Sequence, residues 1–93
     1  MWLGKVVGTL VATPKDASLT GTKLLVVQPL NYNPNQHYPV VAVDTIGAGT
    51  GAAVLVVAGS SARMVTGKPN SAIDAAIVGI VDTLEINQDL LEE

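Results

Sequence analysis

The segment that comes closest to a ligand-binding motif is 44–59, DTIGAGTGAAVLVVAG. Gly47, Gly49 and Ala52 match the spacing of the dinucleotide fingerprint, in which a helix that opens at the glycines holds a pyrophosphate. Residues 53–57 are aliphatic and mostly β-branched, which predicts a strand in place of that helix. We therefore interpret the glycines as a tight strand-to-strand connection with positive φ angles, and we expect no cofactor.

Other candidates for catalytic or metal chemistry are incomplete. The GK pair at 67–68 does not complete a P-loop motif, because Ala62 and Pro69 stand where the motif needs a glycine and a hydroxyl residue. The segment GSSA at 59–62 lacks the second glycine of a nucleophile elbow. The single histidine, His37, falls in a proline-rich loop, and there is no cysteine. We expect neither an enzyme nor a metal site.

Two charged residues, Asp44 and Arg63, flank an uncharged stretch at 45–62. This stretch approaches the length of a membrane-spanning helix, but it holds four glycines, so we interpret it as a strand with its turns. Asp44 and Arg63 are either two solvated charges or a pair that fixes the glycine loop, within the chain or across an interface. A partly buried pair would contribute more to geometry than to net stability.

The composition indicates a protein that associates with other chains. Its 93 residues suffice for one domain, which we place at 1–86, followed by an acidic tail at 87–93. Hydrophobic residues make up 48% of the chain, mostly aliphatic, and this is more apolar surface than one small core readily hides. The net charge is −3 and the five basic residues are scattered, which argues against nucleic-acid and anionic-membrane partners.

Five short apolar runs rich in β-branched residues predict five strands, each bounded by Gly, Pro, Asn or Asp. They are 5–12, 23–28, 40–43, 53–57 and 75–81. Several runs are nearly continuous, which is typical of strands that are buried on both faces or that face a core on one side and a neighbouring chain on the other. No helix of useful length separates them, so we expect a small five-stranded Greek-key barrel.

Shorter elements are predicted between these strands. The segment 60–65 is expected to form a short helix, with Ser60 as its cap and Gly67 as its stop. A turn is expected within 70–76, and 31–39 is expected to be a polar loop. The acidic tail is expected to fray or to form one helical turn. We expect no signal peptide in the opening MWLGKVVG, and the lack of cysteine fits a reducing compartment.

Taken in order, five blocks of the chain closely resemble the EutN/CcmL family, the vertex proteins of bacterial microcompartment shells. These blocks are MWLGKVVGTLVAT (1–13), KLLVVQP (23–29), VAVDTIGAGTG (41–51), GSSAR (59–63) and DAAIVGIVD (74–82). The ordered set is specific, whereas any single block would be weak. The resemblance extends from Met1 to Asp82 and does not include the loop at 31–39 or the tail.

The resemblance implies a barrel of the oligonucleotide/oligosaccharide-binding type, assembled as a homopentamer in the cytoplasm. Such pentamers close the five-fold vertices of a polyhedral shell whose facets are hexameric proteins, and they carry no catalytic residues. A ring of this kind arises when a head-to-tail interface closes on itself. Ser60 and Ser61 become interface candidates. The residues expected at subunit contacts or at a narrow central opening are Gly47, Ala48, Gly49, Thr50 and Gly51.

Ala52 departs from the family pattern, because many members carry a glutamate at this place. If that carboxylate bonds a neighbouring subunit elsewhere in the family, this chain must manage without it. A second function is compatible with the same residues: a small β-barrel module that binds a small molecule or a protein partner without forming shells.

Overall fold

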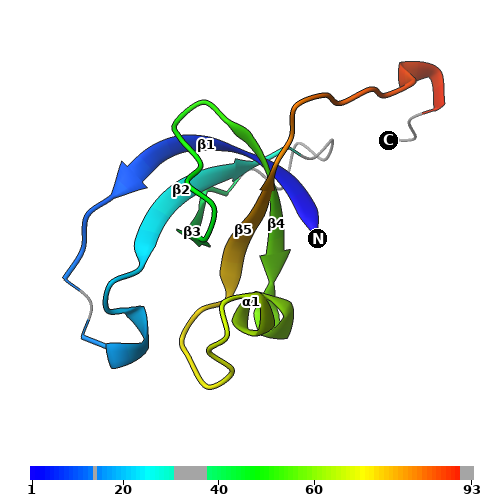
Figure 1. Ribbon diagram of the computed structural model, residues 1–93. Helices are drawn as coiled ribbons and strands as arrows, with labels where there is room; N and C mark the ends of the chain where they lie inside the picture. The colour runs from blue at the N-terminus through cyan, green and yellow to red at the C-terminus, as the bar shows by residue number, and fades with distance from the viewer. Residues whose placement is uncertain (14, 31–37, 91–93) are drawn as a thin grey trace.

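A closed barrel of five strands forms the centre of the protein (Figure 1). The computed structural model describes residues 1–13, 15–30 and 38–90. The strands follow one another around the barrel in the order β1-β2-β3-β5-β4. Their bounds are β1 (Trp2–Leu10), β2 (Lys23–Pro29), β3 (Val40–Asp44), β4 (Ala53–Ala58) and β5 (Ala75–Ile80). The predicted fold class is confirmed, although β1 starts and ends earlier than the apolar run at 5–12 suggests.

Most neighbouring strands run antiparallel, and a short parallel pair closes the barrel. β1 pairs with β2 and β4, while β2 pairs with β3 and β4 pairs with β5, all antiparallel. β3 and β5 are parallel and meet through two residue pairs, Val43 with Ala76 and Asp44 with Ile77. The register shifts in β1 between Val6 and Gly8, as expected of a bulge that bends a strand around a barrel.

The apolar side chains fill two separate cores. The first, inside the barrel, includes Val6, Leu25, Val27, Val54, Val56 and Ile77. The second, beneath the helix α1 (Gly59–Val65), includes Val43, Val57, Ala62, Ile73 and Ala76. Consecutive residues of a strand point to opposite faces. The strands covered by α1 therefore have one face toward the barrel core and the other toward the second core, which explains why their apolar runs are nearly continuous.

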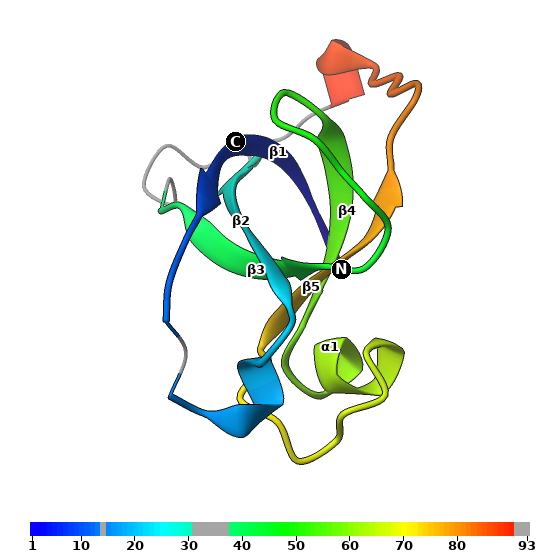
Figure 2. The same ribbon diagram turned by 60° about the vertical axis from the view of Figure 1, so that its left-hand side comes forward.

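Helix α1 packs against β4 and β5 at one end of the barrel (Figure 2). The capping role predicted for Ser60 is wrong: the helix begins one residue earlier, at Gly59, and Ala58 occupies the N-cap position without a side-chain hydrogen bond. The predicted stop is confirmed, since Gly67 follows the helix with a φ of 71°. No helix in the described ranges is long and apolar enough to span a membrane.

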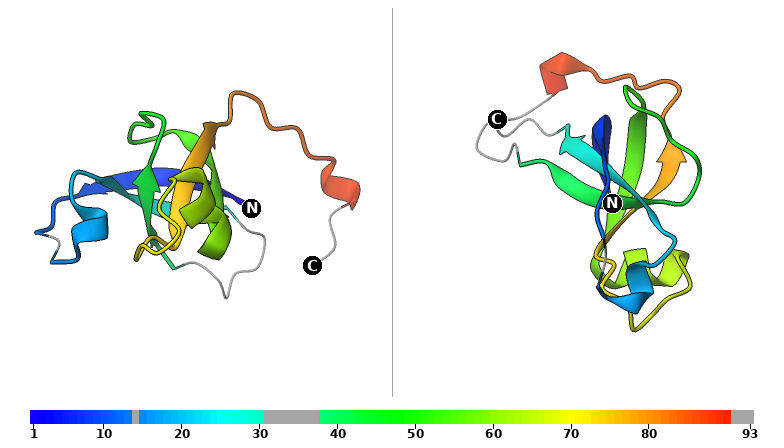
Figure 3. Two further views of the ribbon diagram at one scale, coloured as in Figure 1. Left: turned by 60° about the horizontal axis from the view of Figure 1, so that its bottom comes forward. Right: turned by 90° about the vertical axis from the view of Figure 1, so that its left-hand side faces the viewer.

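Among the described residues, two segments project from the barrel and lengthen the molecule to 47 × 26 × 24 Å (Figure 3). One is the connection between β1 and β2, which includes the 3-10 helix η1 (Ala17–Leu19). The other is the C-terminal segment, whose described part ends in the 3-10 helix η2 (Gln88–Leu90) and agrees there with the predicted helical turn. Most of the predicted polar loop, including His37, lies outside the described residues.

Gly4, buried in β1, provides a test of the barrel packing. A Cβ atom there would collide with the side chain of Val27 and lie 2.9 Å from the Trp2 ring, whereas one at Gly8 would meet only Val26, at 4.0 Å. We expect Gly4→Ala to lower the free energy of unfolding by about 1–3 kcal/mol through overpacking. Gly8→Ala should be neutral or stabilising by up to about 1 kcal/mol, because it restricts the unfolded chain.

Urea unfolding of both variants at one protein concentration measures these changes. Equal stability of Gly4→Ala and Gly8→Ala would show that the crowding at Gly4 is relieved by side-chain movement and does not constrain the barrel.

Candidate functional site

The connection between β3 and β4 contains the three glycines of the sequence motif. We call residues 47–51 the glycine loop. Gly47 and Gly51 have φ angles of 83° and 94°, so the predicted connection with positive φ is confirmed. Gly49 has no positive φ, and a Cβ atom there would meet nothing within 4 Å. The backbone of one chain therefore requires glycine at Gly47 and Gly51 but not at Gly49.

The C-terminal end of the glycine loop is fastened to strand β1. The N–H of Gly51 donates to the carbonyl of Val6 at 2.8 Å, and the N–H of Val6 donates to the carbonyl of Ala52 at 2.9 Å. Ala48 is buried in the barrel core, whereas Gly49 and Thr50 are exposed. The loop is thus held at its end and through Ala48, and it presents the backbone around Gly49 to the outside.

Asp44 fixes the beginning of the glycine loop. Its Oδ1 accepts hydrogen bonds from the backbone N–H groups of Ile46 at 3.1 Å, Gly47 at 3.1 Å and Ala48 at 3.2 Å. The Asp44 side chain is 1% exposed, and its Oδ2 lies 3.5 Å from the Nζ of Lys23. One buried carboxylate therefore orders three consecutive amides, and Lys23 supplies its counter-charge.

The environment of Asp44 favours the ionised carboxylate. Burial is the largest single influence and raises the pKa of Asp44. The three backbone N–H bonds and the charge of Lys23 together lower it more, so the pKa lies below its ordinary value of 3.8. The carboxylate is consequently charged at neutral pH and acts only as a hydrogen-bond acceptor.

Arg63 does not join Asp44 within the chain, which corrects the intrachain form of the predicted pair. The Nη1 of Arg63 instead donates to the carbonyl of Ile73 at 3.2 Å. The reason lies in the strand register, because Lys23 on β2 is directly opposite Asp44 on β3. The sequence did contain a signal for the pair of Lys23 and Asp44, because one predicted strand begins at Lys23 and another is followed directly by Asp44. A pairing of Asp44 and Arg63 across subunits stays a prediction.

Ser60 and Ser61 are exposed in the first turn of α1. Their place at an interface stays a prediction. The segment that follows the glycine loop is strand β4, so the helix that a dinucleotide fingerprint requires does not begin there. Within the described ranges, no three His, Cys, Asp or Glu residues gather in a group that could hold a metal ion.

A family model described as Ethanolamine utilisation protein EutN/carboxysome matches residues 1–82. The chain belongs to the EutN/CcmL family. One relative, the bacterial microcompartment shell vertex protein GrpN of Rhodospirillum rubrum, is 60% identical over 87 residues, which cover 91% of this chain and 97% of GrpN. The shell vertex protein PduN of Salmonella typhimurium is 48% identical over 91 residues, covering 90% of this chain and 98% of PduN.

Solved structures of EutN/CcmL proteins share the fold. The GrpN pentameric microcompartment shell protein from Rhodospirillum rubrum superposes with a TM-score of 0.77 and 52% identity, over 94% of this chain and all of that one. The CcmL structure from Gloeobacter violaceus gives a TM-score of 0.82 with 36% identity, over 94% of this chain and 91% of that one. The resemblance and the barrel expected from the sequence are both confirmed.

The hydrogen bonds of Asp44 make the stability of this EutN/CcmL chain depend on pH. A carboxylate whose folded-state pKa is lowered stabilises the fold above the unfolded-state value of 3.8, and this contribution is lost as the pH falls through the lower folded-state pKa. Asp44→Asn should therefore be less stable than the wild type at pH 7, with the difference vanishing at strongly acidic pH. Thermal unfolding between pH 7 and pH 2 measures both curves.

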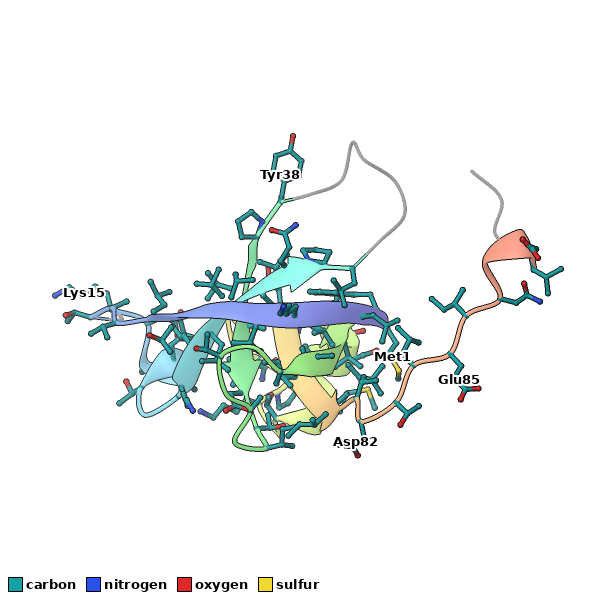
Figure 4. The ribbon with its side chains drawn as sticks, turned by 90° about the horizontal axis from the view of Figure 1, so that it is seen from above. Met1, Lys15, Tyr38, Asp82 and Glu85 are labelled. Atoms are coloured by element: carbon teal, nitrogen blue, oxygen red, sulfur yellow. The ribbon has the colours of Figure 1, made fainter. Side chains whose placement is uncertain are left out.

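The matched control is Asp82→Asn, which removes an equal charge from an exposed position (Figure 4). It should follow the wild-type curve at every pH. Asp44→Ala, which leaves the loop amides without their acceptor, should cost roughly 1–3 kcal/mol. A deficit of Asp44→Asn that stays constant down to pH 2 would mean that the charge of Asp44 does not stabilise the loop.

Proposed function

We propose that this chain is the subunit of a homopentamer that occupies the five-fold vertices of a bacterial microcompartment shell. The observation that carries the proposal is the match to the pentameric GrpN structure over 94% of this chain at 52% identity. The role is structural, without a catalytic step, as the names of the relatives as shell vertex proteins support. The neighbours proposed for the pentamer are hexameric shell proteins, in a shell within the cytoplasm.

The distribution of exposed apolar side chains supports a head-to-tail ring. Val7 on β1 and Val41 on β3 are exposed on the barrel, and Val11, which follows β1, is 97% exposed. Met64 and Val65 are exposed on α1, another part of the surface. A head-to-tail interface joins two different faces of the same subunit, and it forms a ring where the rotation from one subunit to the next closes. Such a ring would cover apolar surface at both places, as the excess of aliphatic residues requires.

The glycine loop is proposed to face neighbouring subunits near the five-fold axis. Within one chain nothing crowds Gly49, so its lack of a side chain has no intrachain explanation. Close approach of a second backbone would supply one, because glycine alone leaves room for such contact. Ser60 and Ser61 are proposed at the same interfaces. Arg63 retains further N–H donors beside its bond to Ile73, and these are proposed to reach an acceptor of a neighbouring subunit.

The mass of the native particle tests the proposed assembly. We expect a particle of five times the chain mass in native mass spectrometry at micromolar concentration. A stable monomer or dimer would contradict the vertex function and favour the alternative, a small binding module. That alternative would gain support only if nucleotides or oligonucleotides bound the small particle saturably in a titration.

Gly49→Val tests the role of the glycine loop in assembly. Because a side chain at this position meets nothing within the chain, the barrel should fold as before. The added bulk should weaken the pentamer, and we expect its dissociation midpoint to rise at least tenfold in a dilution series followed by light scattering.

Thr50→Val is the matched control, since it changes the neighbouring exposed residue without adding volume. Thr50 belongs to the same loop, but the near-isosteric change adds no bulk to the contact, so it should raise the dissociation midpoint far less than Gly49→Val does. If Gly49→Val keeps the wild-type dissociation midpoint, the glycine loop lies away from the subunit contacts.

A further inference from the structure

The chain leaves the barrel after β5. The N–H of Val81 still donates to the carbonyl of Ala53 at 2.8 Å. Residues 82–90, which we call the C-terminal arm, then lead away from the strands (Figures 1 and 3). Seen from above, Asp82 lies close to the end of β5, and Glu85 lies farther out along this departing segment (Figure 4). The arm is therefore positioned to contact something other than its own barrel.

The C-terminal arm carries apolar side chains that its own chain leaves in water. Leu84 is 50% exposed and Leu90 is 78% exposed, while Ile86 is partly buried. Leu84 and Ile86 are two residues apart, so in an extended segment they share one side, and Glu85 points to the other. Over residues 84–86 the arm thus has an apolar side, whose burial would lower its free energy, and a charged side suited to solvent.

The barrel carries an apolar groove of about 750 Å³ on a different part of its surface. The groove lies where β1 and β3 begin and β2 ends, and its walls include Trp2, Pro29, Leu30, Tyr38 and Val40. Leu30 and Tyr38 are exposed at its rim, and Tyr38 projects outward from the start of β3 (Figure 4). The groove also includes Ala75, at the start of β5, and Asp74 just before it, the one charged residue of its lining, whereas the arm departs from the far end of that strand.

We propose that the C-terminal arm of one subunit docks in this apolar groove on a second copy of the chain. Ile86 lies five positions after Val81, so an extended arm carries Ile86 at most about 18 Å from the barrel. This reach is shorter than the smaller dimensions of the molecule, 26 and 24 Å, so the groove that receives it belongs to a subunit in direct contact. Leu84 and Ile86 enter the groove, while Glu85 faces solvent. Exchange of a segment between identical subunits is a general route to oligomers.

This inference rests on the proposed pentamer, because a ring supplies each arm with a neighbouring groove. The arm on one side of a subunit and the groove on another form a head-to-tail contact, which is the type that a ring of five requires. Docking of the arm adds buried apolar area to each interface without changing the barrel. It also gives the exposed leucines of the arm an apolar environment.

The lack of native cysteine allows a direct test by cross-linking. Double variants combine Leu84→Cys or Ile86→Cys in the arm with Leu30→Cys or Tyr38→Cys at the groove. After mild oxidation, at least one pair should form disulfides between chains, visible as a ladder up to the pentamer on a denaturing, non-reducing gel. Glu85→Cys with the same groove cysteines is the matched control and should cross-link at least fivefold less.

The outcomes separate this inference from the proposed function, because native mass is measured on the same samples. A pentamer whose cysteines join only within one chain shows that each arm occupies its own groove and overturns the exchange. A pentamer without any arm-to-groove disulfide overturns it as well. In both cases the vertex function stands, whereas a wild-type monomer contradicts the vertex function itself.

A second variant tests the arm without cross-linking. Leu84→Asp with Ile86→Asp in the full chain should raise the dissociation midpoint of the pentamer at least tenfold. Glu85→Gln should leave it within twofold of the wild type, and the circular dichroism spectrum of the barrel should be retained in both variants. A midpoint within twofold of the wild type for the double aspartate variant would overturn the proposal.

Discussion

Closure of the barrel depends on the two residue pairs that join β3 to β5. They place Val43 beside Ala76 and Asp44 beside Ile77, and the hydroxyl of Thr45 donates to the carbonyl of Ile77 at 2.7 Å. Without this parallel contact the sheet would have two open edges, each with unpaired amides and carbonyls. The contact also positions Asp44, so closure of the sheet and the start of the glycine loop share one residue.

The glycine loop combines two kinds of constraint that look alike in the sequence. At Gly47 and Gly51 the backbone conformation favours glycine, because their φ angles are positive. At Gly49 neither the φ angle nor crowding within the chain requires glycine, so the reason for a glycine there has to come from outside the chain. The buried carboxylate of Asp44 and the two hydrogen bonds to Val6 hold the loop in one shape. A loop held in this way can present its backbone to a partner at low entropic cost.

The apolar composition of the chain reflects two cores and an uncovered surface. Strands with nearly continuous apolar sequences contribute side chains from one face to the core inside the barrel and from the other face to the core under α1. Exposed residues such as Val11, Met64 and Leu90 remain outside both cores. A monomer of this size has too little interior to hide them, which is the usual condition of small subunits made for assembly. The proposed ring and the proposed docking of the C-terminal arm are two ways to cover that surface.

The sequence by itself determined the number and approximate position of the strands, the glycine connection, the helix before β5 and the family. These follow from local preferences, since β-branched runs and turn residues act over a few positions. Only the tertiary structure decided the partner of Asp44, the separate roles of the three glycines, and the groove where β1 and β3 begin. Lys23 and Asp44 are 21 positions apart in the chain and meet through strand register. Arg63 was the plausible partner in the sequence, but it bonds Ile73 because pairing between distant segments, and not spacing along the chain, sets which side chains meet.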